Sequence, residues 1–198
     1  MNSSLPIRLQ TGDALIVVDV QNDFLPGGSL AVPEGDAVVP AINRYIAAFA
    51  ARALPVFATR DWHPPNHCSF EAEGGIWPAH CVAATPGAAF AAGLALPSTA
   101  IVISKAATPG VDAYSGFGGT DLAARLRAGG GTRLFIGGLA TDYCVLNTVK
   151  DALAEGFAVC LLEDAIRAVD VQAGGGARAL AEMQKFGARA MRYEEIAP

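Results

Sequence analysis

Apolar residues occur along the chain in two patterns, as short continuous runs and as longer stretches with a helical spacing. The short runs, of which Ala14 to Val18 is rich in β-branched residues, are typical of strands buried on both faces. From residue 37 to 52 the apolar positions recur on one side of a helix, which predicts an amphipathic helix. Over the whole chain, the pattern predicts strands at 14–18, 55–59, 100–104, 134–136, 158–162 and 188–192, and helices at 37–52, from about 120, from about 142 and at 172–186.

Strands that alternate with helices in this way imply right-handed βαβ units. We therefore expect an α/β fold, a doubly wound and mainly parallel sheet with helices on both faces, formed by a single domain over residues 1–198. A long connection at 61–98, rich in Pro, Gly, His and aromatic residues, interrupts the alternation. A connection of that length with little regular pattern is uncommon unless it is functional.

Composition narrows the class of protein. Hydrophobic residues make up 52% of the 198 residues and charged residues 17%, which is typical of a globular chain with a substantial core. The net charge of −5, without a basic cluster, argues against binding to nucleic acid or to an anionic membrane. No apolar run is long enough to span a bilayer, and the first residues lack the apolar segment of a signal peptide. We therefore expect a cytoplasmic protein whose four cysteines are free thiols.

Reactive side chains follow three of the predicted strands: Asp19 the first, Lys105 the third and Cys144 the fourth. Because the carboxyl ends of parallel strands meet at one edge of the sheet, where ligands bind, these groups are expected to lie together. A carboxylate can accept the thiol proton while a nearby ammonium favours both anions, which would activate Cys144 as a nucleophile. Taken singly, Asp19 could anchor a loop, Lys105 could be a solvated strand end, and Cys144 could be a small buried side chain.

The segment before Cys144 favours the nucleophile interpretation. Gly137 and Gly138 follow an apolar run and allow the backbone to turn sharply. Thr141 or Asp142 is expected to cap the helix that follows, which places Cys144 in its first turn. Unpaired amides and the helix dipole at that position favour a thiolate.

All three histidines of the chain fall in the long connection. His63 forms an Asp-x-His pair with Asp61, and His67 and His80 follow it. One carboxylate and neutral imidazoles suit Zn²⁺, Fe²⁺ or Mn²⁺ and leave coordination positions open. We therefore expect a divalent metal site formed by Asp61 and histidines of this connection, which would make it a metal-binding loop insertion. These histidines could instead be ordinary hydrogen-bonding loop residues. The sequence does not decide whether His67 contacts the metal.

Together these motifs resemble those of the nicotinamidases (pyrazinamidases) in the isochorismatase-like cysteine hydrolase superfamily. The resemblance covers nearly the whole chain, and the motifs occur in the family's order. The matching segments are Asp19-Val-Gln-Asn-Asp-Phe24, Asp61-Trp-His63-Pro-Pro-Asn-His67, Trp77-Pro-Ala-His80-Cys81, Lys105 with Asp112-Ala-Tyr-Ser-Gly-Phe117, and Gly138-Leu-Ala-Thr-Asp-Tyr-Cys144.

The resemblance implies an amidase that hydrolyses nicotinamide to nicotinate and ammonia, and pyrazinamide to pyrazinoate, in NAD salvage. By this analogy Asp19 deprotonates Cys144, and the thiolate attacks the carboxamide carbon to form a thioester. Lys105 holds the charges in place. The expected partner is therefore the small molecule nicotinamide.

The resemblance also implies how the substrate is held. Backbone amides of Ala140 and Cys144 would form the oxyanion hole, and the Leu139–Ala140 peptide bond would be cis. Phe24 and Trp77 would flank the ring as flat apolar walls. Asp61, His63 and His80 would bind the metal, Zn²⁺ being the first expectation, and its free position would take the ring nitrogen.

Other functions remain compatible with the sequence. The substrate could be a carbamoyl or maleamate-type amide, although relatives of that kind generally lack the metal cluster. The metal could activate water directly, with Cys144 structural. A module that binds a small molecule or metal without turnover is the non-enzyme alternative. The identity of the metal and the oligomeric state, a homo-oligomer included, are open.

Overall fold

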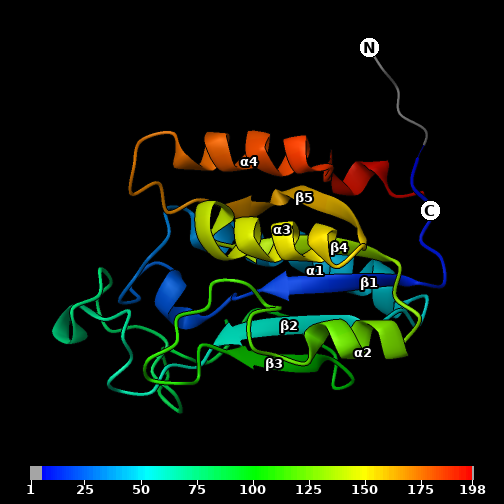
Figure 1. Cartoon of the computed structure of the whole chain (residues 1–198). Coiled ribbons are helices and arrows are strands. Elements are labelled where there is room, and N and C mark those ends of the chain that lie inside the picture. Colours follow the sequence, from blue (N-terminus) through cyan, green and yellow to red (C-terminus); the bar gives the residue numbers. More distant parts are fainter. Residues whose placement is uncertain (1–5, 198) are drawn as a thin grey trace.

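The computed structural model describes residues 6–197. Within this range, six strands form one all-parallel sheet in the order β3-β2-β1-β4-β5-β6 (Figure 1). The doubly wound parallel sheet predicted from the sequence is thereby confirmed. The strands are β1 (Asp13–Val18), β2 (Val56–Asp61), β3 (Ile101–Lys105), β4 (Arg133–Leu139), β5 (Ala158–Arg167) and β6 (Arg189–Met191). The α-helices are α1 (Val38–Ala50), α2 (Leu122–Ala128), α3 (Leu146–Ala154) and α4 (Gly175–Phe186).

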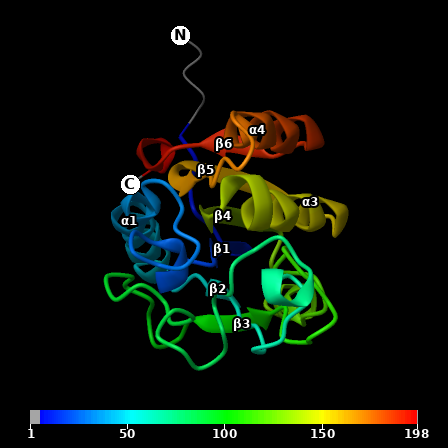
Figure 2. The same ribbon diagram turned by 90° about the vertical axis from the view of Figure 1, so that its left-hand side faces the viewer.

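The helices cover both faces of the sheet (Figure 2). Buried residues of α1 pack on one face with Leu15 and Val17, whereas those of α2, α3 and α4 pack on the other face with Ile16 and Val18. Successive side chains of a strand point to opposite faces, so every residue of β1 is buried. This burial on both faces is the reason why the central strand is a continuous apolar run.

Several element boundaries differ from the prediction, among them the end of β5 and the start of α4. β5 continues to Arg167, which pairs with Leu139 of β4 after a shift in register. The half-buried Asp164 interrupts the apolar run, so the sequence pattern did not indicate that the strand continues beyond it. α4 begins at Gly175 instead of 172, because the preceding Gly174 has a left-handed backbone, with φ at 76°, that ends the loop. All four cysteines, which lie within the described residues, are free thiols as expected.

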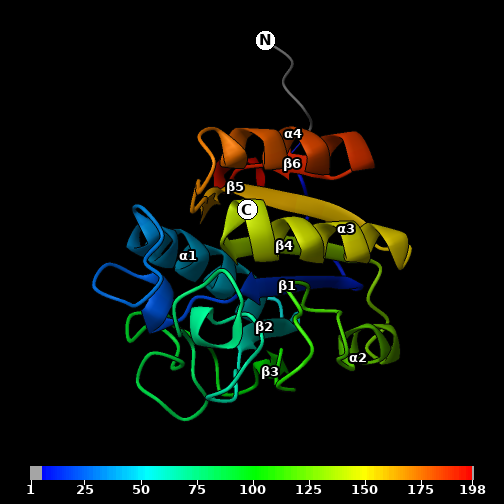
Figure 3. The ribbon, with the colours of Figure 1, turned by 60° about the vertical axis from the view of Figure 1, so that its left-hand side comes forward.

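The strand order reverses between β1 and β4, and ligands of open α/β sheets bind at the carboxyl ends of the strands beside such a point. In Figure 1 the arrows of β1, β2 and β3 point toward the side where the connection between β2 and β3 gathers. Figure 3 brings this connection, which contains the 3₁₀ turn Glu71–Glu73, to the front. Over the part of the chain that is described, no helix is both long and apolar enough to cross a membrane.

Candidate active site

The ammonium group of Lys105 lies close to both of the other reactive side chains predicted from the sequence. Nζ of Lys105 lies 3.0 Å from Oδ2 of Asp19 and 3.5 Å from Sγ of Cys144. It also lies 2.5 Å from Oδ1 of Asp61, a residue that the sequence had pointed to only as a metal ligand. All four side chains are buried. The carboxyl edge of the sheet therefore brings the three predicted groups together and adds a second carboxylate.

Burial and charge act in opposite directions on these groups. Burial raises the pKa of Asp19 above its usual range, and the Lys105 ammonium offsets only part of this rise. Burial also raises the pKa of the Cys144 thiol well above its usual range, again against the effect of Lys105. Burial alone would lower the pKa of Lys105, but the carboxylates of Asp19 and Asp61 raise it well above the ordinary value. The resting site thus holds a neutral thiol, an ammonium, and a carboxyl group with raised proton affinity.

Asp19 is positioned by its own backbone and by Thr59 of β2. Its φ of 49° is left-handed, which is uncommon for a residue other than glycine. The Asp19 amide donates to the Thr59 carbonyl at 3.2 Å, and the Thr59 hydroxyl donates to Oδ1 of Asp19 at 2.6 Å. Oδ2 faces Lys105 and, within the described chain, accepts no well-aligned hydrogen bond. Oδ2 is therefore the oxygen that can take a proton.

Cys144 lies in a π-helical turn, Thr141–Val145, that joins β4 to α3. The Val145 amide donates to the carbonyl of Ala140, five residues earlier, at 3.1 Å. Cys144 thus lies at the start of a helical segment as predicted, in a wider turn than expected. Amides in the first turn of a helix have no partner from an earlier turn.

The predicted helix caps are wrong. Ala140 is the N-cap residue and no side chain caps the turn. Asp142 instead accepts hydrogen bonds from the amides of Val169, at 3.0 Å, and Asp170, at 2.9 Å. The carboxylate is used by the loop between β5 and α4, which approaches from a distant part of the sequence. Asp142 therefore ties that loop to the turn that carries Cys144.

Gly138 and the peptide bond that follows Leu139 set the backbone before this turn. A Cβ at Gly138, where φ is 133°, would lie 2.0 Å from the carbonyl oxygen of Val18, so the close approach of β4 to β1 requires glycine. The Leu139–Ala140 bond is cis, as the resemblance implied. Ala140 then lines the same pocket as Cys144.

Asp61, His63 and His80 form a buried cluster in which one ligand atom of each lies within 4.8 Å of the others. Nδ1 of His63 donates to the Ala106 carbonyl at 3.2 Å, and Nδ1 of His80 donates to the Pro78 carbonyl at 2.8 Å. Since each Nδ1 carries the hydrogen, each Nε2 presents a lone pair. Nε2 of His63 is buried without a hydrogen-bond partner in residues 6–197. This set of donors fits a divalent transition metal.

His67, which the sequence left undecided, has both ring nitrogens engaged. Nδ1 is 2.8 Å from the hydroxyl of Ser69, and Nε2 is 3.1 Å from the carbonyl of Val111. Its ring packs against that of His63 with centroids 4.2 Å apart. The His67 ring therefore packs against the metal cluster, and neither of its nitrogens is free to bind a metal ion.

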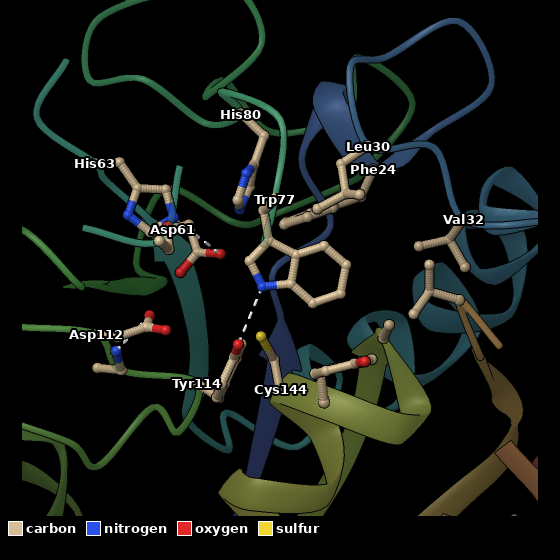
Figure 4. A pocket seen from close by; sticks show the side chains of 15 residues that line it. Phe24, Leu30, Val32, Asp61, His63, Trp77, His80, Asp112, Tyr114 and Cys144 are labelled. Atoms are coloured by element: carbon tan, nitrogen blue, oxygen red, sulfur yellow. Dashed lines mark hydrogen bonds and ion pairs between the residues drawn. The ribbon is translucent and has the colours of Figure 1, made fainter. Parts of the chain in front are cut away.

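A pocket opens above Cys144 and is shared with the metal cluster (Figure 4). Phe24 and Trp77, the predicted ring walls, both line it. Figure 4 shows His63, His80 and Asp61 on one side of Trp77, and Leu30 and Val32 on the other. The pocket therefore has a polar end and an apolar end. The remaining lining residues are Ser69, Asp112, Ala113, Tyr114, Ala140, Tyr143 and Val169.

Gln21 and Tyr114 are among the residues of the site that were given no role from the sequence. Gln21 holds the end of β2, because its side-chain amide donates to the Asp61 carbonyl and accepts from the Asp61 amide, both at 2.8 Å. The hydroxyl of Tyr114 accepts a hydrogen bond from Nε1 of Trp77 at 3.0 Å. Both residues lie in segments that match the family's motifs, and Gln21 also follows a buried strand closely. No local pattern gave Tyr114 a role, because its partner lies in another loop.

The model of the isochorismatase domain matches residues 13–195. The chain belongs to the isochorismatase family. Among its relatives in this family, the nicotinamidase of Escherichia coli (strain K12) is 41% identical over an aligned length of 196 residues, and the match covers 88% of this chain and 92% of the relative.

Solved structures extend the likeness to three dimensions. The pyrazinamidase of Pyrococcus horikoshii in complex with zinc has a TM-score of 0.88 and 50% identity, covering 92% of this chain and 99% of that chain. PnC1 of L. infantum in complex with nicotinate has a TM-score of 0.91 and 40% identity, covering 98% of this chain and 99% of that chain. The resemblance predicted from the motifs is thereby confirmed, and so is the fold.

Proposed function

We propose that the chain is a metal-containing cysteine amidohydrolase, a nicotinamidase that converts nicotinamide and water to nicotinate and ammonia, and pyrazinamide to pyrazinoate, in NAD salvage. One observation carries the proposal: a buried thiol paired with Lys105 and a His-His-carboxylate cluster open onto the same aromatic pocket. Relatives with nicotinamidase and pyrazinamidase activity support the choice of substrate.

In the proposed mechanism Asp19 is the base and Cys144 the nucleophile. The thiol proton passes to Asp19, whose raised pKa suits it as an acceptor. The sulfur attacks the carboxamide carbon, and the amides of Ala140 and Cys144 stabilise the oxyanion. Asp19 returns the proton to the leaving ammonia, which leaves an acyl thioester on Cys144. Water then adds to the thioester, with Asp19 as its base, and releases the carboxylic acid.

Lys105 keeps this site from accumulating unpaired charge. With Asp19 and Asp61 both ionised, its ammonium is the buried counter-charge that lies within 3.0 Å of each. When the thiolate forms, the same ammonium is 3.5 Å from the sulfur. Lys105 therefore stabilises negative charge as it moves from Asp19 to Cys144.

The metal would be held by Asp61, His63 and His80, and we propose Zn²⁺. When bound, it would supply a Lewis acid that could bind the ring nitrogen of the substrate. Phe24 and Trp77 hold the ring between apolar surfaces, which places the carboxamide above Cys144. The metal at the polar end of the pocket and the apolar surfaces of Phe24 and Trp77 would thus orient the substrate together.

An ammonia-release assay on nicotinamide tests the proposal, using wild-type protein, the Cys144→Ala variant and chelator-treated protein. The wild type should release ammonia, and Cys144→Ala should lose at least about 10⁴-fold in kcat while it keeps a cooperative unfolding transition. Chelation should reduce turnover, and added Zn²⁺ should restore it. Turnover by Cys144→Ala that remains sensitive to chelator would instead favour hydrolysis by a metal-activated water. Ligand-induced stabilisation of the wild type without ammonia release would favour a binding module.

A further inference from the structure

The indole of Trp77 is held by a hydrogen bond from another part of the chain. Nε1 of Trp77 donates to the hydroxyl oxygen of Tyr114 at 3.0 Å, drawn as a dashed line in Figure 4. Trp77 comes from the connection between β2 and β3, and Tyr114 from the connection between β3 and α2. Both residues line the pocket. The contact therefore joins two loops directly at the pocket wall.

The backbone around Trp77 does not by itself fix the indole. The Trp77 amide donates to the Ser69 carbonyl at 3.0 Å, and the Trp77 carbonyl accepts from the Glu71 amide at 2.7 Å. These bonds fix the main chain but not the side-chain torsions, which depend on the contacts of the indole itself: its packing against Tyr143, with ring centroids 4.9 Å apart, and its hydrogen bond to Tyr114. The indole N–H is a donor that a largely buried tryptophan must satisfy, and Tyr114 supplies its acceptor.

Tyr114 is well suited to hold another ring, because its own loop is fastened on both sides. Before it, Nζ of Lys105 donates to the Ala113 carbonyl at 3.2 Å. After it, the Gly116 amide donates to the hydroxyl of Thr148, on α3, at 3.0 Å. The hydroxyl of Tyr114 is therefore presented from a segment tied both to the catalytic lysine and to the helix behind the nucleophile.

We propose that Tyr114 is a positioning residue that fixes the Trp77 indole as one wall of the substrate pocket. The inference rests on the proposed function for its kinetic consequence, but the contact itself does not depend on it. Without the hydroxyl acceptor, the indole can leave the orientation in which it flanks the substrate ring. The loss should weaken binding of the ring and leave the chemistry at Cys144 largely intact, since Tyr114 acts on the wall and not on the reacting atoms.

The Tyr114→Phe variant tests this role, because it removes one oxygen and keeps the ring. KM for nicotinamide should rise about three- to tenfold, the range expected for one neutral hydrogen bond, with kcat within about twofold of the wild type. A fall in kcat with unchanged KM would overturn the proposal and place the hydroxyl in the chemistry. An unchanged KM and kcat would overturn it as well.

A double-mutant cycle asks whether Tyr114 acts through Trp77. Trp77→Phe removes the N–H donor, so adding Tyr114→Phe to it should change KM less than twofold beyond the effect of Trp77→Phe alone. Independent, multiplying effects of the two substitutions would show that Tyr114 contacts the substrate by another route and would overturn the positioning role.

Fluorescence gives a readout that needs no turnover. The chain has two tryptophans, so Trp62→Phe leaves Trp77 as the single emitter. In this background, Tyr114→Phe should increase the acrylamide quenching constant of Trp77 at least twofold, because the indole becomes more mobile and more exposed. Unchanged quenching would overturn the inference even if nicotinamide is hydrolysed. Absence of ammonia release by the wild type, with the quenching change present, would reject the proposed function and leave the Tyr114–Trp77 contact standing.

Discussion

The central strand β1 has a buried aspartate at each of its two ends, and the two are used in different ways. Asp13, at the start, receives two hydrogen bonds from Arg133, from Nε to Oδ1 at 2.8 Å and from Nη2 to Oδ2 at 2.7 Å. The amide of Gln10 donates a third at 2.8 Å. Asp19, directly after the end, has a hydroxyl donor on one oxygen and a lysine shared with Asp61 on the other. Both carboxylates are nearly inaccessible to solvent.

The difference lies in how completely each charge is compensated. The guanidinium of Arg133 matches both oxygens of Asp13 in a fixed planar geometry, so each oxygen of this carboxylate has a charged donor of its own. The Lys105 ammonium near Asp19 is a point charge divided between two carboxylates and a thiol, and burial raises the pKa of Asp19. One end of the strand thus carries a stabilising pair and the other a group prepared for proton transfer.

Matched substitutions of aspartate by asparagine should separate these two uses, and Asp19→Asn should have the larger effect. It removes the proposed base and keeps the side-chain shape, so kcat/KM for nicotinamide should fall at least about a thousandfold. Stability should fall by no more than about 1 kcal/mol, because the charge that is removed is costly to bury. Ammonia release and urea unfolding measure the two quantities. Substantial activity in Asp19→Asn would show that another group takes the proton.

The cluster of Asp61, His63 and His80 lies at the same carboxyl edge of the sheet as Asp19, so substitutions there should also affect function. His80→Ala should reduce Zn²⁺ affinity more than about a hundredfold, since it removes a ligand. His67→Gln is the matched histidine variant and should reduce affinity at least tenfold less, because both ring nitrogens of His67 already have partners. Competition with a chromogenic chelator measures both. Equal losses in the two variants would mean that His67 is a ligand.

The Zn²⁺ affinity should also depend on pH, in a way that follows from the burial of His80. Burial lowers the pKa of His80 below its ordinary value of 6.5, so the imidazole is neutral at that pH and can offer Nε2 as a ligand. The contribution of His80 to Zn²⁺ affinity, measured as the ratio of the affinities of the wild type and His80→Ala, should therefore hold down to pH 6.5 and fall only on further acidification. A decline that begins well above pH 6.5 would contradict the effect of burial on His80.

At the opposite end of β1, Asp13→Asn should affect stability and leave the chemistry alone. It removes the charge that Arg133 binds, and because the arginine is a quarter exposed the cost should be about 1–2 kcal/mol, or a few degrees in Tm. The kcat of the folded protein at 25 °C should stay within about twofold of the wild type. Loss of kcat without loss of Tm would show that Asp13 contributes to the reaction and would contradict a purely stabilising role.

The smallest expected effect concerns the hydroxyl that supports Asp19. The hydrogen bond from Thr59 favours the ionised carboxylate and so lowers the pKa of Asp19 against the larger effect of burial. Thr59→Val should therefore raise that pKa further, keep the proton on Asp19 to higher pH, and move the acidic limb of the kcat/KM profile upward. Activity on this limb should fall by up to about tenfold. Thr59→Ser keeps the hydroxyl and should keep the wild-type profile.

Much of the fold and of the chemistry could be predicted from local patterns. The apolar run of β1 and the spacing in α1 depend on which faces are buried, and burial leaves a period in the sequence. The position of Cys144 after a glycine turn has a local cause as well, because Gly138 must pass Val18 closely. The reversal of strand order then brought Asp19 and Cys144 to one edge, a general property of such sheets.

The errors have a common origin in contacts between distant segments. Thr141 and Asp142 look like helix caps because such residues commonly cap helices, but the Asp142 carboxylate accepts from the amides of Val169 and Asp170. β5 runs past its apolar core because β4 remains available for pairing. In each case the partner is far away in the sequence, so the local pattern could not indicate it.

The sequence by itself determined the order of strands and helices along the chain and the kinds of group that meet at the carboxyl edge, since these follow from periodicity and from residue chemistry. Its motifs also indicated the family, by resemblance. Only the tertiary structure decided how the charges are divided: that Lys105 serves Asp61 as well as Asp19, and that both nitrogens of His67 are already occupied. It also decided that Trp77 is held by Tyr114. These facts depend on distances of a few ångströms between loops, and such distances are set by packing, which has no period in the sequence.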